Sequence, residues 1–115
     1  MRLHPIQMIM KRFGQIIHLK PEYADEYVKQ HAVVWPGVLA MITACNIQNY
    51  SIFKKDLVLF AYFEYVGNDF DGDMARMAAD PETQRWWDVV KPLMQPIETR
   101  NVGEFWADME EVFHA

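Results

Sequence analysis

Residues 57–66 (LVLFAYFEYV) constrain the fold of this chain more than any other segment. Glu64 is the one charged residue among them, and apolar side chains occupy both alternating sets of positions. A strand with two apolar faces is typical of a central position in a sheet. Turn-forming residues bound the segment on both sides, at 54–56 and at 67–69. We therefore predict a central strand over residues 57–66.

The other elements follow from hydrophobic periodicity and from residues that begin helices. Pro21, Pro36 and Pro81 suit the first turn of a helix, and Asp80 suits the N-cap position before the last of these. Trp35 precedes a proline and is therefore disfavoured in helical conformation. We predict strands over residues 11–19, 46–54 and 105–113, and helices over residues 21–33, 36–45, 69–79 and 81–90.

The order of these elements is strand, helices, strand, strand, helices, strand. It predicts an α+β fold of ferredoxin-like type, an antiparallel sheet with helices on one face. The other face of the sheet needs cover, because a long apolar strand is a liability when it is exposed. We expect two such sheets to pack face to face in a homodimer. Residues 10–115 are expected to form a single domain, and residues 1–9 a tail or leader.

Composition narrows the class of function. A formal net charge of −5 argues against nucleic acid and against an anionic membrane surface as partners, because both need a basic protein surface. No stretch is long and apolar enough to span a bilayer. Cys45, the one cysteine, cannot form an internal disulfide. It is expected to be a buried apolar residue of a cytoplasmic protein.

Trp86 and Trp87 are adjacent on a predicted helix, so their side chains point about 100° apart. A single core-facing stripe cannot easily bury both indoles. We expect one of the two to belong to the core and the other to line a pocket together with Tyr50. A flat, half-apolar ligand such as a sugar ring suits such an aromatic surface.

Tyr27 and His31 lie four residues apart, which places a phenol and an imidazole on one helix face. Histidine titrates near neutrality and is the usual proton shuttle. Of the four histidines in the chain, His31 is the candidate for catalysis. A structural role is the alternative for a lone helical histidine, and Trp35 and the Trp86–Trp87 pair favour the functional interpretation.

Other chemistries find little support in the sequence. No two histidines have metal-ligand spacing, and no glycine-rich phosphate loop occurs. Asp69, Asp71 and Asp73 resemble the start of a calcium loop but lack the glutamate that must follow, so they indicate a helix N-terminus. Ser51, the one serine, lies within a predicted strand and not on a nucleophile elbow. We expect neither a metal nor a cofactor.

Four short motifs occur in an order that resembles the L-rhamnose mutarotase family over about residues 10–114. They are Tyr27-x-x-x-His31 leading to Trp35-Pro36, then Asn49-Tyr50-Ser51-Ile52, Gln84-Arg85-Trp86-Trp87 and Met109-Glu110-Glu111-Val112-Phe113. The chain departs from the family pattern at Ala32, where asparagine is frequent. Residues 66–73 resemble an insertion relative to shorter members.

The resemblance implies a dimeric ferredoxin-like α/β-barrel that interconverts the α and β anomers of L-rhamnose without a cofactor. The family's proton-donor histidine falls on His31, and this donor would serve the ring oxygen. Its sugar-contacting tyrosines fall on Tyr27 and Tyr50, and its tandem tryptophans on Trp86 and Trp87. Three alternatives remain: a mutarotase for another 6-deoxyhexose such as L-fucose, a small dimeric-barrel monooxygenase, and a sugar-sensing protein.

Overall fold

The computed structural model describes residues 10–115 of the chain. Residues 1–9, the predicted tail or leader, lie outside the described residues. The elements in chain order are β1 (Lys11–Leu19), η1 (Pro21–Tyr23), α1 (Ala24–His31), α2 (Pro36–Ala44), β2 (Ile47–Lys55), β3 (Val58–Tyr65), α3 (Phe70–Ala79), α4 (Pro81–Val90), η2 (Lys91–Leu93), β4 (Met94–Gln95) and β5 (Ala107–Met109).

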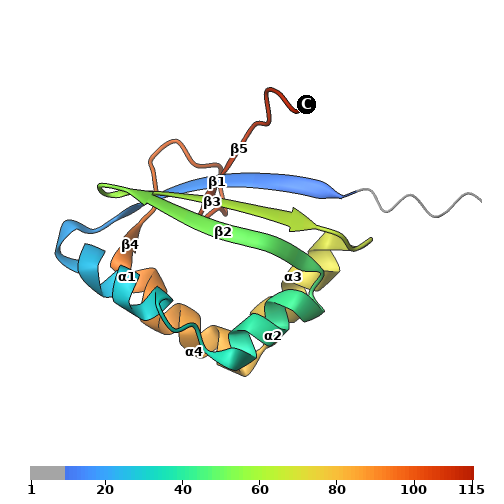
Figure 1. The fold of residues 1–115 in the computed structure, drawn as a ribbon, viewed down its shortest axis with the longest axis horizontal. Coiled ribbons are helices and arrows are strands. Elements are labelled where there is room, and N and C mark those ends of the chain that lie inside the picture. Colours follow the sequence, from blue (N-terminus) through green and yellow to red (C-terminus); the bar gives the residue numbers. More distant parts are fainter. Residues whose placement is uncertain (1–9) are drawn as a thin grey trace, which may run out of the picture.

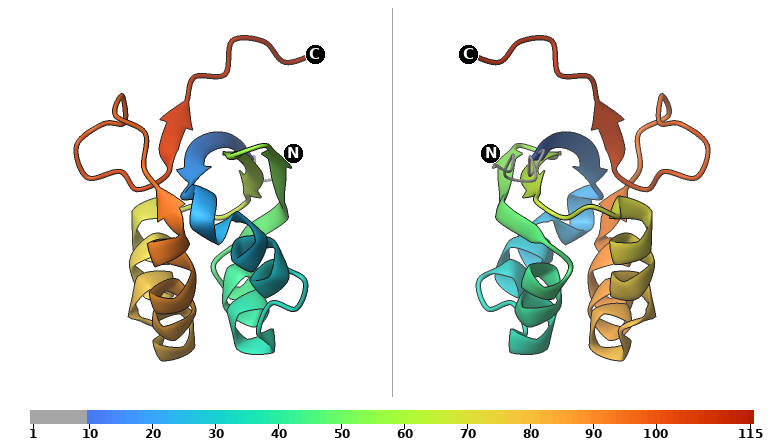
Figure 2. Two further views of the ribbon diagram at one scale, coloured as in Figure 1. Left: turned by 90° about the vertical axis from the view of Figure 1, so that its left-hand side faces the viewer. Right: turned by 90° about the vertical axis from the view of Figure 1, so that its right-hand side faces the viewer.

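The strands form one antiparallel sheet in the order β2-β3-β1-β4, and the short β5 pairs with β1 beside β4. The sheet is curled, and all four α-helices lie on its concave side (Figure 1). Views from the two ends show α1 and α2 on one side of the helical layer and α3 and α4 on the other (Figure 2). The predicted α+β fold of ferredoxin-like type is therefore confirmed.

β3 lies between β2 and β1, as its apolar composition predicts. Its side chains alternate between the two faces of the sheet, in keeping with the period of a strand. Leu59, Ala61, Phe63 and Tyr65 are buried on the helix side. Phe60 points to the helix-free side and remains 37% exposed. The two faces of this strand thus meet different environments, although both are apolar.

The hydrophobic core lies between the sheet and the helices. A cluster of buried side chains from both layers fills its larger part: Ile17, Leu19, Leu59, Tyr27, Val38, Trp86, Val90, Leu93 and Met94. A smaller cluster of Ile47, Phe63 and Tyr65 lies toward α3. Cys45 is also buried, as predicted. Burial of these apolar groups is the dominant favourable contribution to folding.

Helix starts follow the predicted local chemistry. Pro36 and Pro81 occupy the first turns of α2 and α4, and the Asp80 carboxylate accepts a hydrogen bond from the Thr83 backbone N–H at 2.9 Å. Asp69 caps α3 by accepting from the Gly72 N–H at 3.0 Å, so the acidic group at 69–73 is a helix N-terminus. No helix within residues 10–115 is long and apolar enough to cross a membrane.

Two element predictions are wrong in their extent. Residues 21–33 do not form one helix: their first turn is the 3-10 helix η1, and α1 ends at His31. The β-branched Val33 and Val34 and the extended Trp35 before Pro36 account for this early end, because none of them favours helix.

The predicted strand over residues 105–113 is reduced to β5, which pairs with β1 only at Gly14–Ile16. Phe105 and Trp106 precede it and line the space below the sheet. Residues 110–115 leave the sheet on its helix-free side (Figure 1). An ion pair of 2.7 Å between Arg12 and Glu111 links this segment to β1. A strand extends only as far as its neighbour accepts backbone hydrogen bonds.

Candidate active site

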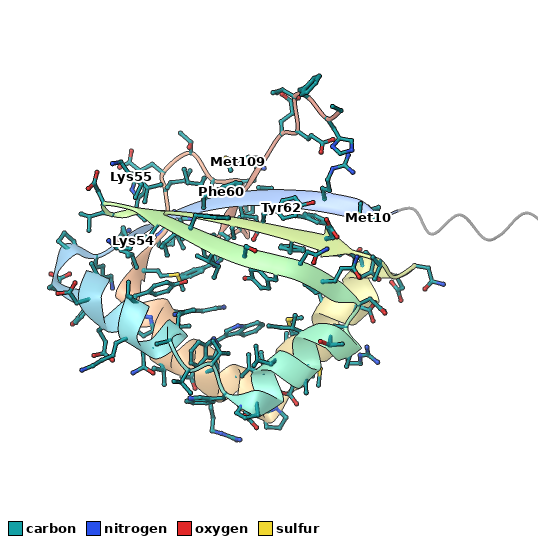
Figure 3. All side chains as sticks on the ribbon, in the orientation of Figure 1. Met10, Lys54, Lys55, Phe60, Tyr62 and Met109 are labelled. Atoms are coloured by element: carbon teal, nitrogen blue, oxygen red, sulfur yellow. The ribbon has the colours of Figure 1, made fainter. Side chains whose placement is uncertain are left out.

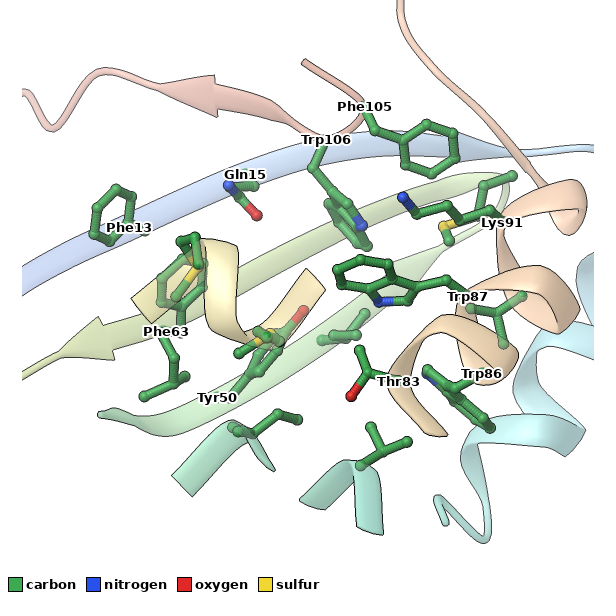
Figure 4. A pocket seen from close by; sticks show the side chains of 18 of the residues that line it. Phe13, Gln15, Tyr50, Phe63, Thr83, Trp86, Trp87, Lys91, Phe105 and Trp106 are labelled. Atoms are coloured by element: carbon green, nitrogen blue, oxygen red, sulfur yellow. The ribbon is translucent and has the colours of Figure 1, made fainter. Parts of the chain in front are cut away.

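A cavity of about 490 Å³ lies between the concave side of the sheet and the helices. This volume is within the range of small-molecule sites, roughly 300–1,000 Å³. Aromatic side chains dominate its lining, and a few polar groups interrupt it (Figure 4). All five residues predicted from the sequence line this one cavity: Tyr27, His31, Tyr50, Trp86 and Trp87.

The end of α1 fixes the orientation of His31. Its Nδ1 lies 2.9 Å from the backbone carbonyl oxygen of Tyr27, one helical turn earlier. A carbonyl oxygen only accepts hydrogen bonds, so Nδ1 carries the proton in the neutral ring. The imidazole also stacks on the Tyr27 ring, with 4.0 Å between centroids, and meets the edge of Trp86 at 5.1 Å. Three contacts therefore hold the ring in one position.

The other ring nitrogen of His31, Nε2, has no hydrogen-bond partner among residues 10–115, and it is not sealed from solvent. Burial lowers the pKa of His31 below its ordinary value of 6.5, although the hydrogen bond to the Tyr27 carbonyl acts in the opposite direction. The ring is therefore neutral at pH 7. In that form Nε2 holds a lone pair and can accept a proton.

Tyr27 and Tyr50 bring two phenols to the same cavity from α1 and β2. Burial raises the pKa of Tyr50 to about 12 and the pKa of Tyr27 well above its ordinary value of 10. The nearby Tyr50 raises the pKa of Tyr27 further. Although 41% of the Tyr50 surface is exposed, its hydroxyl end points into the cavity (Figure 4). Both phenols remain protonated at pH 7 and are hydrogen-bond donors.

A β-bulge in β2 places Tyr50. The register with β3 shifts between Gln48 and Ser51, and Asn49 has a φ of 51°, in the left-handed region that asparagine tolerates. The extra residue turns Tyr50 and Ile52 toward the cavity while Ser51 and Phe53 remain exposed. Bulges often re-aim a side chain near a functional site. The side-chain alternation of an unbroken strand would therefore not predict that Tyr50 faces the cavity.

The two tryptophans separate as predicted into one core residue and one residue with an exposed part. Trp86 is 5% exposed and packs edge-on against Trp35, with 5.3 Å between centroids. Trp87 is half-buried, and its ring projects toward the centre of the cavity (Figure 4). Trp86 nevertheless contributes part of the cavity wall beside His31.

Several further polar or amphipathic residues in the lining are absent from the sequence prediction, among them Gln15, Lys91 and Trp106. Gln15 had a detectable signal, because it is polar at a position of β1 that points inward between Phe13 and Ile17. Its amide donates to the Asp108 carboxylate at 2.7 Å. Lys91 and Trp106 had none, because Lys91 lies just beyond the predicted helix, Trp106 lies in a segment without clear periodicity, and both reach the cavity through tertiary packing.

The arrangement suits acid/base chemistry on a small polar molecule. It offers one neutral imidazole with a free nitrogen, two protonated phenols and an exposed indole face. Among residues 10–115, no group of three or more His, Cys, Asp or Glu side chains is placed to hold a metal ion.

The comparison with known protein families matches residues 12–115 to the family model for L-rhamnose mutarotase. The chain belongs to the L-rhamnose mutarotase family. Two relatives that bear this name support the assignment over nearly their whole length. The one from Oceanobacillus iheyensis is 34% identical over 113 residues, with 91% of this chain and 98% of the relative covered. The one from Ligilactobacillus salivarius is 38% identical over 108 residues, with 90% and 95% covered.

Solved structures share the fold of this mutarotase-family chain. The crystal structure of an L-rhamnose mutarotase from Formosa agariphila superposes with a TM-score of 0.68 at 23% identity, covering 91% of this chain and 98% of that one. Tetracenomycin F2 cyclase from Streptomyces glaucescens superposes with a TM-score of 0.63 at 11% identity, with the same coverage. One scaffold thus occurs in proteins that bear different names.

The different burial of the two tryptophans predicts different effects on stability. Trp86→Ala should lower the free energy of unfolding by about 3–5 kcal/mol, because it leaves a cavity in the core. Trp87→Ala should lower it much less, since part of that ring already meets solvent. Urea unfolding followed by circular dichroism measures both. Equal losses for the two variants would contradict the assignment of Trp86 to the core.

Proposed function

We propose that this protein interconverts the α and β anomers of L-rhamnose, with His31 as the acid/base group and Tyr27, Tyr50, Trp86 and Trp87 as the residues that contact the sugar. The free Nε2 of a neutral, rigidly held imidazole in an aromatic cavity carries the proposal. Membership of the family and the names of the relatives support L-rhamnose as the substrate.

Ring opening begins with the removal of the proton from the anomeric hydroxyl. The neutral Nε2 of His31 takes this proton as the C1–O5 bond breaks and the C1=O1 bond forms. The ring oxygen O5 leaves as an alkoxide and needs a proton. We assign that donation to the Tyr27 phenol, which is protonated at pH 7 and stacks on His31. The imidazolium then releases its proton to solvent and the Tyr27 phenolate takes one up from solvent, so protons balance over the step.

Closure reverses these transfers after the aldehyde has rotated by half a turn. The exposed part of the Trp87 ring offers an apolar face for the C–H side of the sugar and its methyl group. The Tyr50 phenol donates a hydrogen bond to a hydroxyl. Trp86 acts mainly by holding His31. The family resemblance instead makes His31 the direct donor to the ring oxygen, which requires the imidazolium form at the start.

Anomer exchange tests the proposed activity. Saturation-transfer NMR on equilibrated L-rhamnose should show protein-dependent transfer between the α and β anomeric protons. His31→Gln should reduce the exchange rate by about 10²–10⁴-fold, the usual contribution of a general acid or base. His18→Gln is the matched control, because His18 is exposed on β1.

Other outcomes of the same measurement point elsewhere. Transfer on L-fucose that exceeds transfer on L-rhamnose would make this a mutarotase for another 6-deoxyhexose. Saturable sugar binding without exchange would indicate a sensing protein. Oxygen consumption with a quinol and no exchange would indicate a monooxygenase. Wild-type exchange by His31→Gln would remove His31 from the mechanism.

The pH dependence of the rate tests the direction of the first proton transfer. If neutral His31 accepts the anomeric proton, kcat/KM rises with pH through an apparent pKa below 6.5 and then reaches a plateau. If the imidazolium is the initial donor, kcat/KM falls instead as pH rises through the same pKa. Initial rates of L-rhamnose mutarotation between pH 5 and 8, corrected for spontaneous exchange, decide between these directions.

We further propose a homodimer formed through the helix-free face of the sheet. Phe53, Phe60 and Met109 are exposed there by 60%, 37% and 40%, and Tyr62 lies on the same side (Figure 3). Phe53 and Phe60 stack across β2 and β3 with 6.2 Å between centroids. An exposed aromatic patch on a sheet face is typical of a surface that a second protein covers. The two cavities would then lie on the outer sides of the dimer.

Light scattering after size exclusion measures the oligomeric state. The wild-type protein should elute with twice the chain mass of 13.6 kDa, and Phe60→Glu should elute as a monomer. Val89→Glu on α4 is the matched control, since Val89 is also 37% exposed but lies in the helical layer. A wild-type monomer, or a Phe60→Glu dimer, would reject this interface. A cytoplasmic location and the absence of nucleic acid as a partner stay predictions from the composition.

A further inference from the structure

Lys91 places an ammonium group at the cavity wall. It is the first residue of η2, directly after α4, and its stem is half-buried. Its Nζ lies 4.4 Å from the centroid of the Trp87 ring and 5.1 Å from the centroid of the Phe105 ring. Figure 4 shows the nitrogen between Trp87, Phe105 and Trp106, on the cavity side of the chain. Cation–π attraction to two rings holds the ammonium there.

The ammonium of Lys91 has no carboxylate within salt-bridge distance and no hydrogen-bond acceptor among residues 10–115. The two carboxylates that share the lining already accept hydrogen bonds elsewhere. Glu104 accepts from the backbone N–H groups of Asn101 at 2.8 Å and Asp108 at 3.3 Å. Asp108 accepts from Gln15 at 2.7 Å. Three N–H donors therefore remain unused beside an aromatic cavity.

Lys91 and His31 approach the cavity from two sides of the tryptophan pair. His31 contacts Trp86, and Lys91 contacts Trp87. Adjacent helical side chains diverge by about 100°, so these two contacts are on different sides of α4. Both residues line the same cavity. A molecule bound in this cavity can therefore contact both His31 and the ammonium of Lys91.

We propose that Lys91 is a substrate-binding and specificity-determining residue whose ammonium donates hydrogen bonds to hydroxyl oxygens of the sugar ring, away from the anomeric centre that His31 serves. This inference rests on the proposed function. A neutral polyol is the ligand class because it offers many oxygen acceptors without a charge. Glu104 and Asp108 in the same lining would repel an anionic ligand.

The position of a bound hydroxyl beside Lys91 depends on the configuration of the sugar. L-Rhamnose and L-fucose differ in the orientation of the hydroxyls at C2 and C4. A fixed donor therefore stabilises one pattern more than the other, and a site built to hydrogen-bond a hydroxyl rejects a sugar that leaves the donor unpaired. Lys91 would thus contribute to the choice of sugar and not to the proton transfers.

Lys91→Met keeps an unbranched apolar stem of nearly the same length and removes the charge and the donors. We expect KM for L-rhamnose to rise about 10–100-fold, the equivalent of one hydrogen bond to a charged group, with kcat nearly unchanged. The dissociation constant from tryptophan fluorescence should rise by the same factor. The ratio of affinities for L-rhamnose and L-fucose should move toward one. Lys91→Arg should recover part of the loss, because it restores the cation and donors.

Lys29→Met is the matched control, because Lys29 is exposed on α1. Unchanged KM and dissociation constant in Lys91→Met would overturn the inference. So would equal losses for both sugars together with a lower kcat, since that result would make Lys91 only a packing support for Trp87. Absence of anomer exchange by the wild-type protein would contradict the proposed function instead, and fluorescence titration would still test whether Lys91 binds the sugar.

Discussion

The packing of Trp86 supports most of the site. Its indole lies against Trp35 at the start of α2 and against His31 at the end of α1, while α4 carries it. One buried ring thus joins three helices on the concave side of the sheet. Aromatic rings bury a large area and prefer edge-on contacts, so this junction is both strong and directional. The cavity exists because the helices are held in this arrangement while Trp87, one residue later, points into the space between them.

The chemical state of the site depends on backbone features more than on charged neighbours. A main-chain carbonyl selects the tautomer of His31, and a β-bulge brings the Tyr50 phenol inward. Burial then sets the protonation states: it lowers the pKa of the imidazole and raises the pKa of both phenols. The result is one base and two donors at neutral pH. Low polarity at the site thus produces complementary acid and base groups from ordinary side chains.

The two faces of the sheet present similar apolar side chains to different surroundings. On the concave side, Phe63 and Tyr65 of β3 meet the helices and close the core. On the other side, Phe53 and Phe60 stack on each other in the open. Because side chains alternate along a strand, one apolar segment supplies both surfaces. This explains why residues 57–66 lack the polar alternation of a strand that faces water.

The local sequence was sufficient for most of the framework. Proline positions, helix caps and the apolar central strand predicted the element order, and β1 and α4 have the predicted bounds. The i, i+4 relation of Tyr27 and His31 and the divergence of Trp86 and Trp87 are properties of any α-helix, so the sequence predicts each pair. Tertiary packing brings both pairs and Tyr50 to one cavity. The local sequence does not predict three other features: the length of β5, the bulge at Asn49, and the placement of Lys91 over Trp87 and Phe105. They depend on which backbone groups a neighbour leaves free and on contacts between segments far apart in the chain, so no local pattern encodes them.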